Sequence, residues 1–215
     1  MNQHHLPVTR TARYYTIGTP SADTRHIWFC LHGFGQLATY FGRKFSGLAS
    51  PDTLIVIPEG LSRLYLDNTY TRVGASWLTR EDRDAEIADF TGYLNALYDQ
   101  VLDGRDPAAL HISLLGFSQG AATACRWLAS GHIRVDRLIL WAGYFPEGLQ
   151  SIIDPARLAN REVQYVYGRQ DEYIQAMPDP DAYLARLQAD VPTLRITAFD
   201  GGHRVEPAVL AQLIA

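Results

Sequence analysis

The stretch Gly116-Phe117-Ser118-Gln119-Gly120 lies between an apolar run at residues 110–115 and a run of mostly small residues at 121–128. The first run predicts a buried strand and the second a closely packed helix. Gly-x-Ser-x-Gly between a strand and a helix indicates a sharp turn that strains the serine backbone and exposes its hydroxyl. Free N–H groups at the start of the helix can bind an anion beside that oxygen. The pattern also fits an ordinary strand–turn–helix loop, so evidence from the rest of the sequence is needed to tell whether Ser118 is a nucleophile.

The composition is that of an ordinary globular domain. Of 215 residues, 47% are hydrophobic and 20% charged, which predicts one domain over residues 1–215. The net charge of −4, without a basic patch, disfavours nucleic-acid binding. We expect no signal peptide, because residues 1–7 lack its pattern, and no membrane span or stable membrane association. Cys30 and Cys125 lie in apolar segments, which favours free thiols in a reduced, cytoplasmic protein.

Strand patterns alternate with helical patterns along the chain. Strands are expected at residues 13–17, 26–31, 53–57, 110–115, 137–142, 163–167 and 194–199, and helices at 39–49, 80–102, 121–128, 180–189 and 206–214, with a long loop at 59–79. This alternation predicts an α/β fold with a mostly parallel sheet and helices on both faces. In such sheets the active residues follow the C-terminal ends of the strands.

The candidate nucleophile needs a histidine to take its proton and an acid to orient that histidine. In this setting the chain order is serine, then acid, then histidine. His203 directly follows the last predicted strand. His132 instead follows the far end of the elbow helix, the predicted helix at 121–128 that begins after the sharp turn (the elbow) at Ser118. Asp171 follows the strand at 163–167, with Glu172 as the neighbouring alternative. We therefore predict that His203 is the general base and Asp171 its orienting acid.

A glycine-containing loop follows the buried strand at 26–31. Its sequence is His32-Gly33-Phe34-Gly35. A tetrahedral intermediate carries an oxyanion that needs preorganised N–H donors. We predict that the backbone N–H groups of Phe34 and Gln119 form this oxyanion hole. His32 begins the loop and is expected to brace it by hydrogen bonds.

Four motifs carry a family resemblance: His32-Gly-Phe-Gly35, Gly116-Phe-Ser-Gln-Gly120, Gly168-x-x-Asp171 and Gly202-His203. In this order and spacing they resemble the phospholipase/carboxylesterase family of α/β-hydrolases, which includes small carboxylesterases and acyl-protein thioesterases. The similarity runs from about residue 26 to the end of the sequence. The chain departs from that family at Ala121, where relatives usually have a second glycine, and in the residues around the acid.

The resemblance implies an α/β-hydrolase fold and a catalytic triad of Ser118, Asp171 and His203. It also implies hydrolysis of carboxylic esters or thioesters through an acyl-enzyme, without metal or cofactor. The short connection at residues 142–162 leaves no room for a large lid. Two other functions stay open: a peptidase or acyltransferase with the same triad, and a non-catalytic ligand-binding protein on a hydrolase scaffold.

Aromatic residues in the loops near the strand ends are candidates for substrate contacts. Trp77 and Tyr144 are the best placed in the sequence, although each could instead anchor its loop to the core. No basic amphipathic helix is evident, which favours a small-molecule ester or thioester over a lipid surface. The sequence leaves open the acyl group, the alcohol or thiol group and the oligomeric state.

Overall fold

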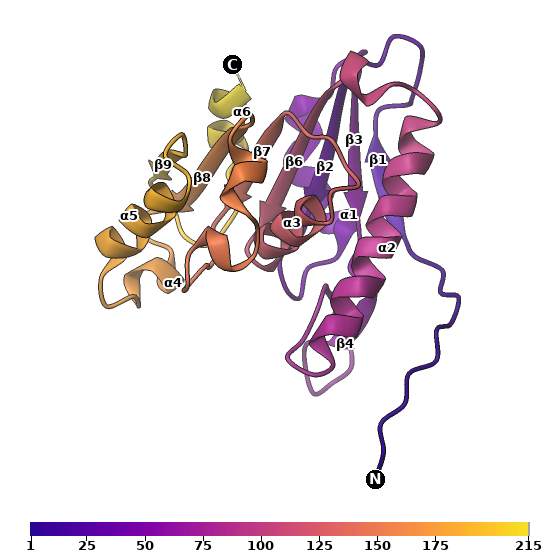
Figure 1. Cartoon of the computed structure of the whole chain (residues 1–215), viewed down its shortest axis with the longest axis horizontal. Helices are drawn as coiled ribbons and strands as arrows, with labels where there is room; N and C mark the ends of the chain where they lie inside the picture. The colour runs from indigo at the N-terminus through magenta and orange to yellow at the C-terminus, as the bar shows by residue number, and fades with distance from the viewer. Residues whose placement is uncertain (215) are drawn as a thin grey trace.

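Seven strands form the central sheet of the computed structural model, which describes residues 1–214 (Figure 1). They are β1 (Tyr14–Ile17), β2 (His26–Leu31), β3 (Thr53–Pro58), β6 (His111–Phe117), β7 (Arg137–Trp141), β8 (Glu162–Gly168) and β9 (Arg195–Phe199). Their order across the sheet is β1-β3-β2-β6-β7-β8-β9. Every neighbouring pair is parallel except β1 with β3. The predicted α/β class with a mostly parallel sheet is confirmed, and β9 lies at an edge.

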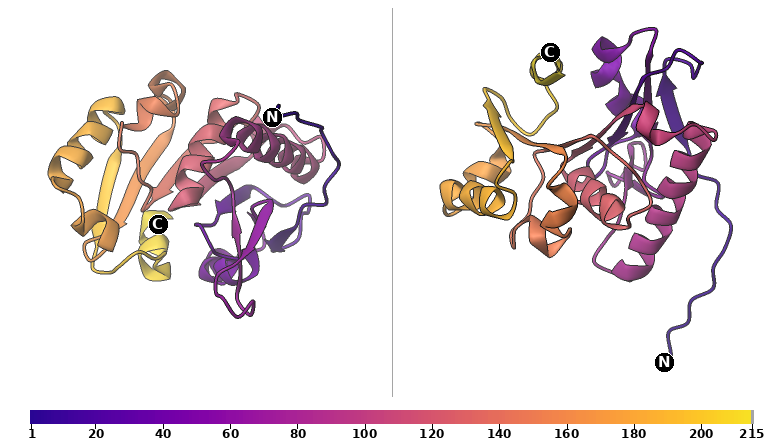
Figure 2. Two further views of the ribbon diagram at one scale, coloured as in Figure 1. Left: turned by 90° about the horizontal axis from the view of Figure 1, so that it is seen from below. Right: turned by 45° about the horizontal axis from the view of Figure 1, so that its top comes forward.

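Helices cover both faces of this sheet (Figure 2). They are α1 (Ala38–Phe41), α2 (Arg83–Leu102), α3 (Gln119–Ala129), α4 (Glu172–Gln175), α5 (Pro180–Asp190) and α6 (Pro207–Ile214). Among the helices of residues 1–214, none combines the length and hydropathy that crossing a bilayer requires.

Alternate side chains of the strands enter two separate cores. In β2, Ile27 and Phe29 pack in the core formed with α2, α3 and α5, whereas Trp28 and Cys30 pack in the core formed with α1 and α6. Successive strand residues point to opposite faces, so a strand buried on both faces is apolar throughout. This arrangement explains the continuous apolar run at residues 26–31.

The predicted helix at residues 39–49 is wrong over most of its length. Four residues are α-helical in α1, and the chain continues as a 3-10 helix at Gly42–Leu48. Gly42 and Gly47 weaken α-helical propensity there. In addition, a Cβ atom on Gly42 would lie 3.1 Å from the Ile57 side chain, so the segment packs very close to β3.

The predicted loop at residues 59–79 contains a hairpin. Strands β4 (Ser62–Tyr65) and β5 (Val73–Ser76) pair antiparallel, apart from the central sheet. Ala75 also forms an isolated bridge with Gln36, just after the loop that begins at His32. The hairpin therefore supports a segment that is distant in sequence, which no local pattern could indicate.

The elbow helix α3 begins in direct contact with the end of β2. A Cβ atom on Gly120 would lie 2.4 Å from the carbonyl oxygen of Leu31 and 2.6 Å from that of His32. These contacts are too short for any side chain. Glycine at position 120 thus sets how closely the elbow approaches the loop after β2.

A buried carboxylate directly follows β3 and supports the same region. Glu59 accepts hydrogen bonds from the guanidinium groups of Arg13 and Arg63, and at 3.2 Å from the backbone N–H of Ala38. Burial alone would raise the pKa of Glu59, but the hydrogen bonds from Arg63 and Arg13 hold that pKa below its ordinary value of 4.5. Glu59 is therefore ionised in the folded protein.

We expect Gly120→Ala to lower the free energy of unfolding by about 1–3 kcal/mol, because the added methyl group meets two backbone carbonyls. Urea unfolding measures this change. Gly92→Ala is the matched control: Gly92 lies inside α2 with nothing within 4 Å of an added Cβ, so this change should stabilise the protein by about 0.5–1 kcal/mol. Equal effects from both substitutions would contradict the close contact at Gly120.

We expect Glu59→Gln to lower the free energy of unfolding by about 1–3 kcal/mol at neutral pH, since it removes charged hydrogen bonds in a buried site. Because the pKa of Glu59 is lowered by folding, its contribution is present above 4.5 and is lost as the pH falls through the folded-state value. The difference from wild type should therefore shrink in acid, as urea unfolding across pH would show. Glu147→Gln, at an exposed position, should change little at any pH.

Candidate active site

Ser118 occupies the turn between β6 and α3 with a strained backbone. Its φ and ψ are 54° and −117°, which is rare for a residue with a side chain. The Ser118 N–H donates to the carbonyl of Trp141 at 2.8 Å, which ties the turn to β7. Such strain costs about 1–3 kcal/mol and persists only where the surroundings impose it. The predicted sharp turn is thus present.

The structure brings together the three residues of the predicted triad. His203 Nε2 lies 2.9 Å from Ser118 Oγ, and His203 Nδ1 lies 2.7 Å from Asp171 Oδ2. With the proton on Nδ1, His203 donates to the carboxylate and accepts the serine hydroxyl proton through Nε2. Both distances fall in the range of about 2.6–3.2 Å that links a nucleophile to its base.

The carboxylate of Asp171 is buried and makes a second hydrogen bond. Asp171 is only 1% exposed, and its second oxygen, Oδ1, accepts the backbone N–H of Tyr173 at 2.9 Å. Asp171 therefore both caps α4 and orients His203. Glu172, the alternative acid, is exposed one residue further along.

Two aromatic rings hold the imidazole of His203. The ring of Phe117 lies 4.9 Å and that of Tyr173 4.7 Å from the His203 ring, centroid to centroid. Sequence reasoning missed Tyr173, because it lies in α4, a four-residue helix too short to show a periodic pattern.

The loop after β2 meets the elbow at Gly33. A Cβ atom on Gly33 would lie 3.1 Å from Ser118 Cβ. The N–H of Gly33 donates to Gln36 Oε1 and that of Gly35 to the carbonyl of Ala75. Across residues 1–214, the N–H groups of Phe34 and Gln119 have no acceptor. The two predicted oxyanion donors therefore both lie in the turns that meet at Ser118 with their N–H groups unengaged.

The buried ring of His32 holds this loop through two hydrogen bonds. The fully buried ring accepts the Gly60 N–H through Nε2 at 2.9 Å, and its Nδ1 lies 2.8 Å from the Gly33 carbonyl. Burial lowers the pKa of His32, so the ring is neutral with its proton on Nδ1. The predicted bracing role agrees with these contacts.

Trp77 lies behind the same loop. It is 2% exposed, and its indole N–H donates to the His32 carbonyl at 2.8 Å. The Gln119 side chain accepts the Trp77 backbone N–H at 3.0 Å and donates to the Leu78 carbonyl at 2.8 Å. The predicted substrate contact of Trp77 is therefore not supported, because the ring supports the backbone instead of lining the cavity. Sequence reasoning missed this role of Gln119.

A cavity of about 440 Å³ opens beside Ser118 and His203. Tyr144, the other predicted substrate contact, lines this cavity and is 59% exposed. The residue before Tyr144 is held in place, because the hydroxyls of Tyr165 and Tyr183 both donate to the Gly143 carbonyl, at 2.8 and 2.9 Å. The connection from β7 to β8 holds two short 3-10 helices and forms no large lid over this cavity.

Solved structures of low sequence identity share this fold. The chain is similar to acyl-protein thioesterase 2 of Zea mays at 17% identity, covering 94% of this chain and 96% of that chain with a TM-score of 0.68. It is similar to SOBER1 of Arabidopsis thaliana at 16% identity, covering 88% and 96% with a TM-score of 0.61. It is also similar to esterase PE8 at 20% identity, covering 94% and 99% with a TM-score of 0.61. These likenesses confirm the α/β-hydrolase fold.

No curated protein matches the chain significantly. The sequence does match the family model described as Serine hydrolase (FSH1) over residues 24–208. The match takes in Ser118, Asp171 and His203, and it agrees with the resemblance found in the motifs. The chain belongs to the serine hydrolase (FSH1) family.

Proposed function

We propose that this protein hydrolyses carboxylic esters through an acyl-enzyme on Ser118. The observation that carries the proposal is the continuous hydrogen-bond chain from Ser118 Oγ through His203 to Asp171. A lone serine hydroxyl is a weak nucleophile at neutral pH. In this hydrogen-bond series, His203 supplies the base and Asp171 orients its imidazole.

In the first half-reaction, Ser118 Oγ attacks the ester carbonyl while His203 Nε2 takes the hydroxyl proton. Asp171 stabilises the imidazolium that results. When the tetrahedral intermediate collapses, the C–O bond breaks and His203 protonates the leaving alcohol. Water then attacks the acyl-enzyme with His203 as base, and the acid is released.

The oxyanion of each tetrahedral intermediate is stabilised by the N–H groups of Phe34 and Gln119. Removing one such donor in other hydrolases costs about 2.7–4 kcal/mol of barrier. Support for these two donors comes from their unengaged N–H groups and from the contacts that hold their turns together at Gly33 and Gly120.

A thioester could undergo the same two steps, and the Zea mays structure bears the name acyl-protein thioesterase. We favour oxygen esters as the first substrates to test, in matched pairs with thioesters of the same acyl group. The higher kcat/KM within each pair shows whether the protein prefers oxygen esters or thioesters.

We expect Ser118→Ala to lower turnover of 4-nitrophenyl acetate about 10⁴-fold or more, and to abolish labelling by a fluorophosphonate probe. Asp171→Asn should also lower kcat by about 10⁴-fold, because the amide favours the wrong imidazole tautomer. His132→Gln, which changes an exposed histidine paired with Asp99, is the control and should keep wild-type turnover. Full labelling of Ser118→Ala would exclude Ser118 as the nucleophile.

A rapid burst of 4-nitrophenol, equal to the enzyme concentration, would demonstrate the acyl-enzyme. A non-catalytic binding protein gives no burst.

We expect Tyr144→Ala to raise KM about three- to tenfold for longer acyl chains, because the variant loses apolar contact area in the cavity. Acetyl esters, which are too short to reach the ring, serve as the internal control. An equal change in KM for acetyl and octanoyl esters would argue against a contact between Tyr144 and the acyl chain.

A further inference from the structure

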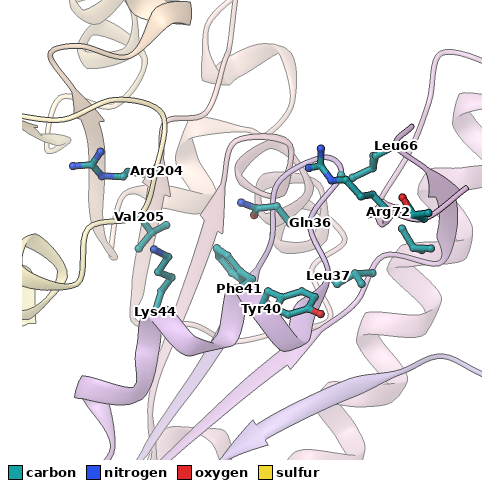
Figure 3. Close-up of a pocket in the computed structure, with 12 residues that line it drawn as sticks. Gln36, Leu37, Tyr40, Phe41, Lys44, Leu66, Arg72, Arg204 and Val205 are labelled. Atoms are coloured by element: carbon teal, nitrogen blue, oxygen red, sulfur yellow. The ribbon is translucent and has the colours of Figure 1, made fainter. Parts of the chain in front are cut away.

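A second cavity, of about 600 Å³, is lined by residues next in sequence to parts of the candidate active site, and Figure 3 shows its lining. Gly35 and Gln36, which line it, directly follow Phe34 of the proposed oxyanion hole, and Arg204 directly follows His203. Neighbouring Cα atoms are about 3.8 Å apart, so the cavity begins one residue away from two parts of the site. The cavity therefore lies close to the site at two points of the chain.

Three cationic side chains surround this cavity, and none of its twelve lining residues is acidic. They are Lys44 from the 3-10 helix after α1, Arg72 from the β4–β5 hairpin and Arg204 from the loop before α6. The chain as a whole is acidic, with a net charge of −4. A local excess of positive charge on an acidic protein attracts anions to that place.

Two of these cations have no carboxylate partner. Across residues 1–214, neither Lys44 nor Arg72 forms a salt bridge, whereas Arg204 pairs with Glu206 at 2.9 Å. Asp67, an acidic residue near Arg72 in sequence, accepts hydrogen bonds from the backbone N–H groups of Thr71 and Arg72 and not from the guanidinium. Lys44 and Arg72 are both exposed and free to bind an anion.

Much of the remaining lining of the cavity is apolar or aromatic: Leu37, Tyr40, Phe41, Leu66, Val73 and Val205. Figure 3 shows Phe41 and Tyr40 between Lys44 on one side and Arg72 on the other. A volume of about 600 Å³ accommodates a small organic molecule rather than a single ion. Apolar side chains and cations in one cavity suit a short carbon chain that ends in a carboxylate, which arginine can bind through two parallel hydrogen bonds.

We propose that Lys44, Arg72 and Arg204 bind a carboxylate of the substrate, so that the protein acts on esters that carry a free carboxylate. This inference rests on the proposed ester hydrolysis at Ser118 and names the substrate class. The carboxylate lies on the acyl side or on the alcohol side of the ester, and the two sides are tested separately.

The first experiment compares kcat/KM between charged and neutral esters of the same size. On the acyl side, mono-4-nitrophenyl glutarate is compared with its terminal amide; on the alcohol side, 4-acetoxybenzoate is compared with 4-acetoxybenzamide. We expect the carboxylate to be preferred about tenfold or more within one of the pairs, as one charge-assisted hydrogen bond provides. Turnover of all four esters without preference for the carboxylate in either pair overturns the subsite, while the proposed hydrolysis stands.

The double variant Lys44→Gln and Arg72→Gln should lower that preference about tenfold and weaken its dependence on salt. Arg195→Gln is the matched control, since Arg195 lies at the N-terminal end of β9, where the strands begin, and its side chain is 73% exposed. The preference should not change in this control. An unchanged preference in the double variant would also overturn the proposal.

A second experiment measures carboxylate binding at the subsite without relying on catalysis. Lys44 is the only lysine in the sequence, so an amine-acetylating reagent modifies Lys44 and the N-terminal amine alone. In the Ser118→Ala variant, glutarate should slow acetylation of Lys44 about tenfold relative to the N-terminal amine, and glutaramide should not. Equal rates with both compounds would overturn carboxylate binding. If no ester is turned over by wild-type protein, the proposed hydrolysis fails, and this protection assay still tests the subsite.

Discussion

The close approach of α3 to the end of β2 is the contact on which the rest of the site depends. At Gly120 the helix backbone touches the carbonyls of Leu31 and His32, with no space for a methyl group. That contact forces the chain through a turn at Ser118 with a positive φ, because the strand must end and the helix begin within one residue. The same approach brings the loop after β2 against the serine, so the predicted nucleophile and the predicted oxyanion donors are positioned together.

Behind that contact, buried polar groups keep the loop in one conformation. His32 bridges the N–H of Gly60 and the carbonyl of Gly33, and the indole of Trp77 binds the His32 carbonyl. Directly after β3, Glu59 accepts the backbone N–H of Ala38, the first residue of α1. Because each of these groups is satisfied by a partner in the protein, moving the loop would leave buried hydrogen-bonding groups unpaired. Such preorganisation lets N–H dipoles stabilise developing charge without rearranging during the reaction.

Two cavities of different chemistry flank the site. The one beside Tyr144 is lined with aromatic and aliphatic groups and has no charged rim apart from the predicted triad itself. The other combines apolar and aromatic side chains with Lys44, Arg72 and Arg204. A substrate that occupies both would place its ester between an apolar group and an anionic one. Specificity would then come from residues outside the elbow, contributed by the β4–β5 hairpin and the segment after α1.

The sequence alone determined the α/β architecture and the sharp turn at Ser118, and it predicted Asp171 and His203 as the residues that lie hydrogen-bonded in line with Ser118, because these follow from local periodicity and from chain order at strand ends. It missed the hairpin within residues 59–79, the short helix that carries Tyr173 and the burial of Trp77. Only the tertiary structure decided these features, since each depends on partners distant in sequence. The cationic cavity is the clearest case: its three cations come from separate segments that carry no common motif, and only packing around the sheet brings them to one place.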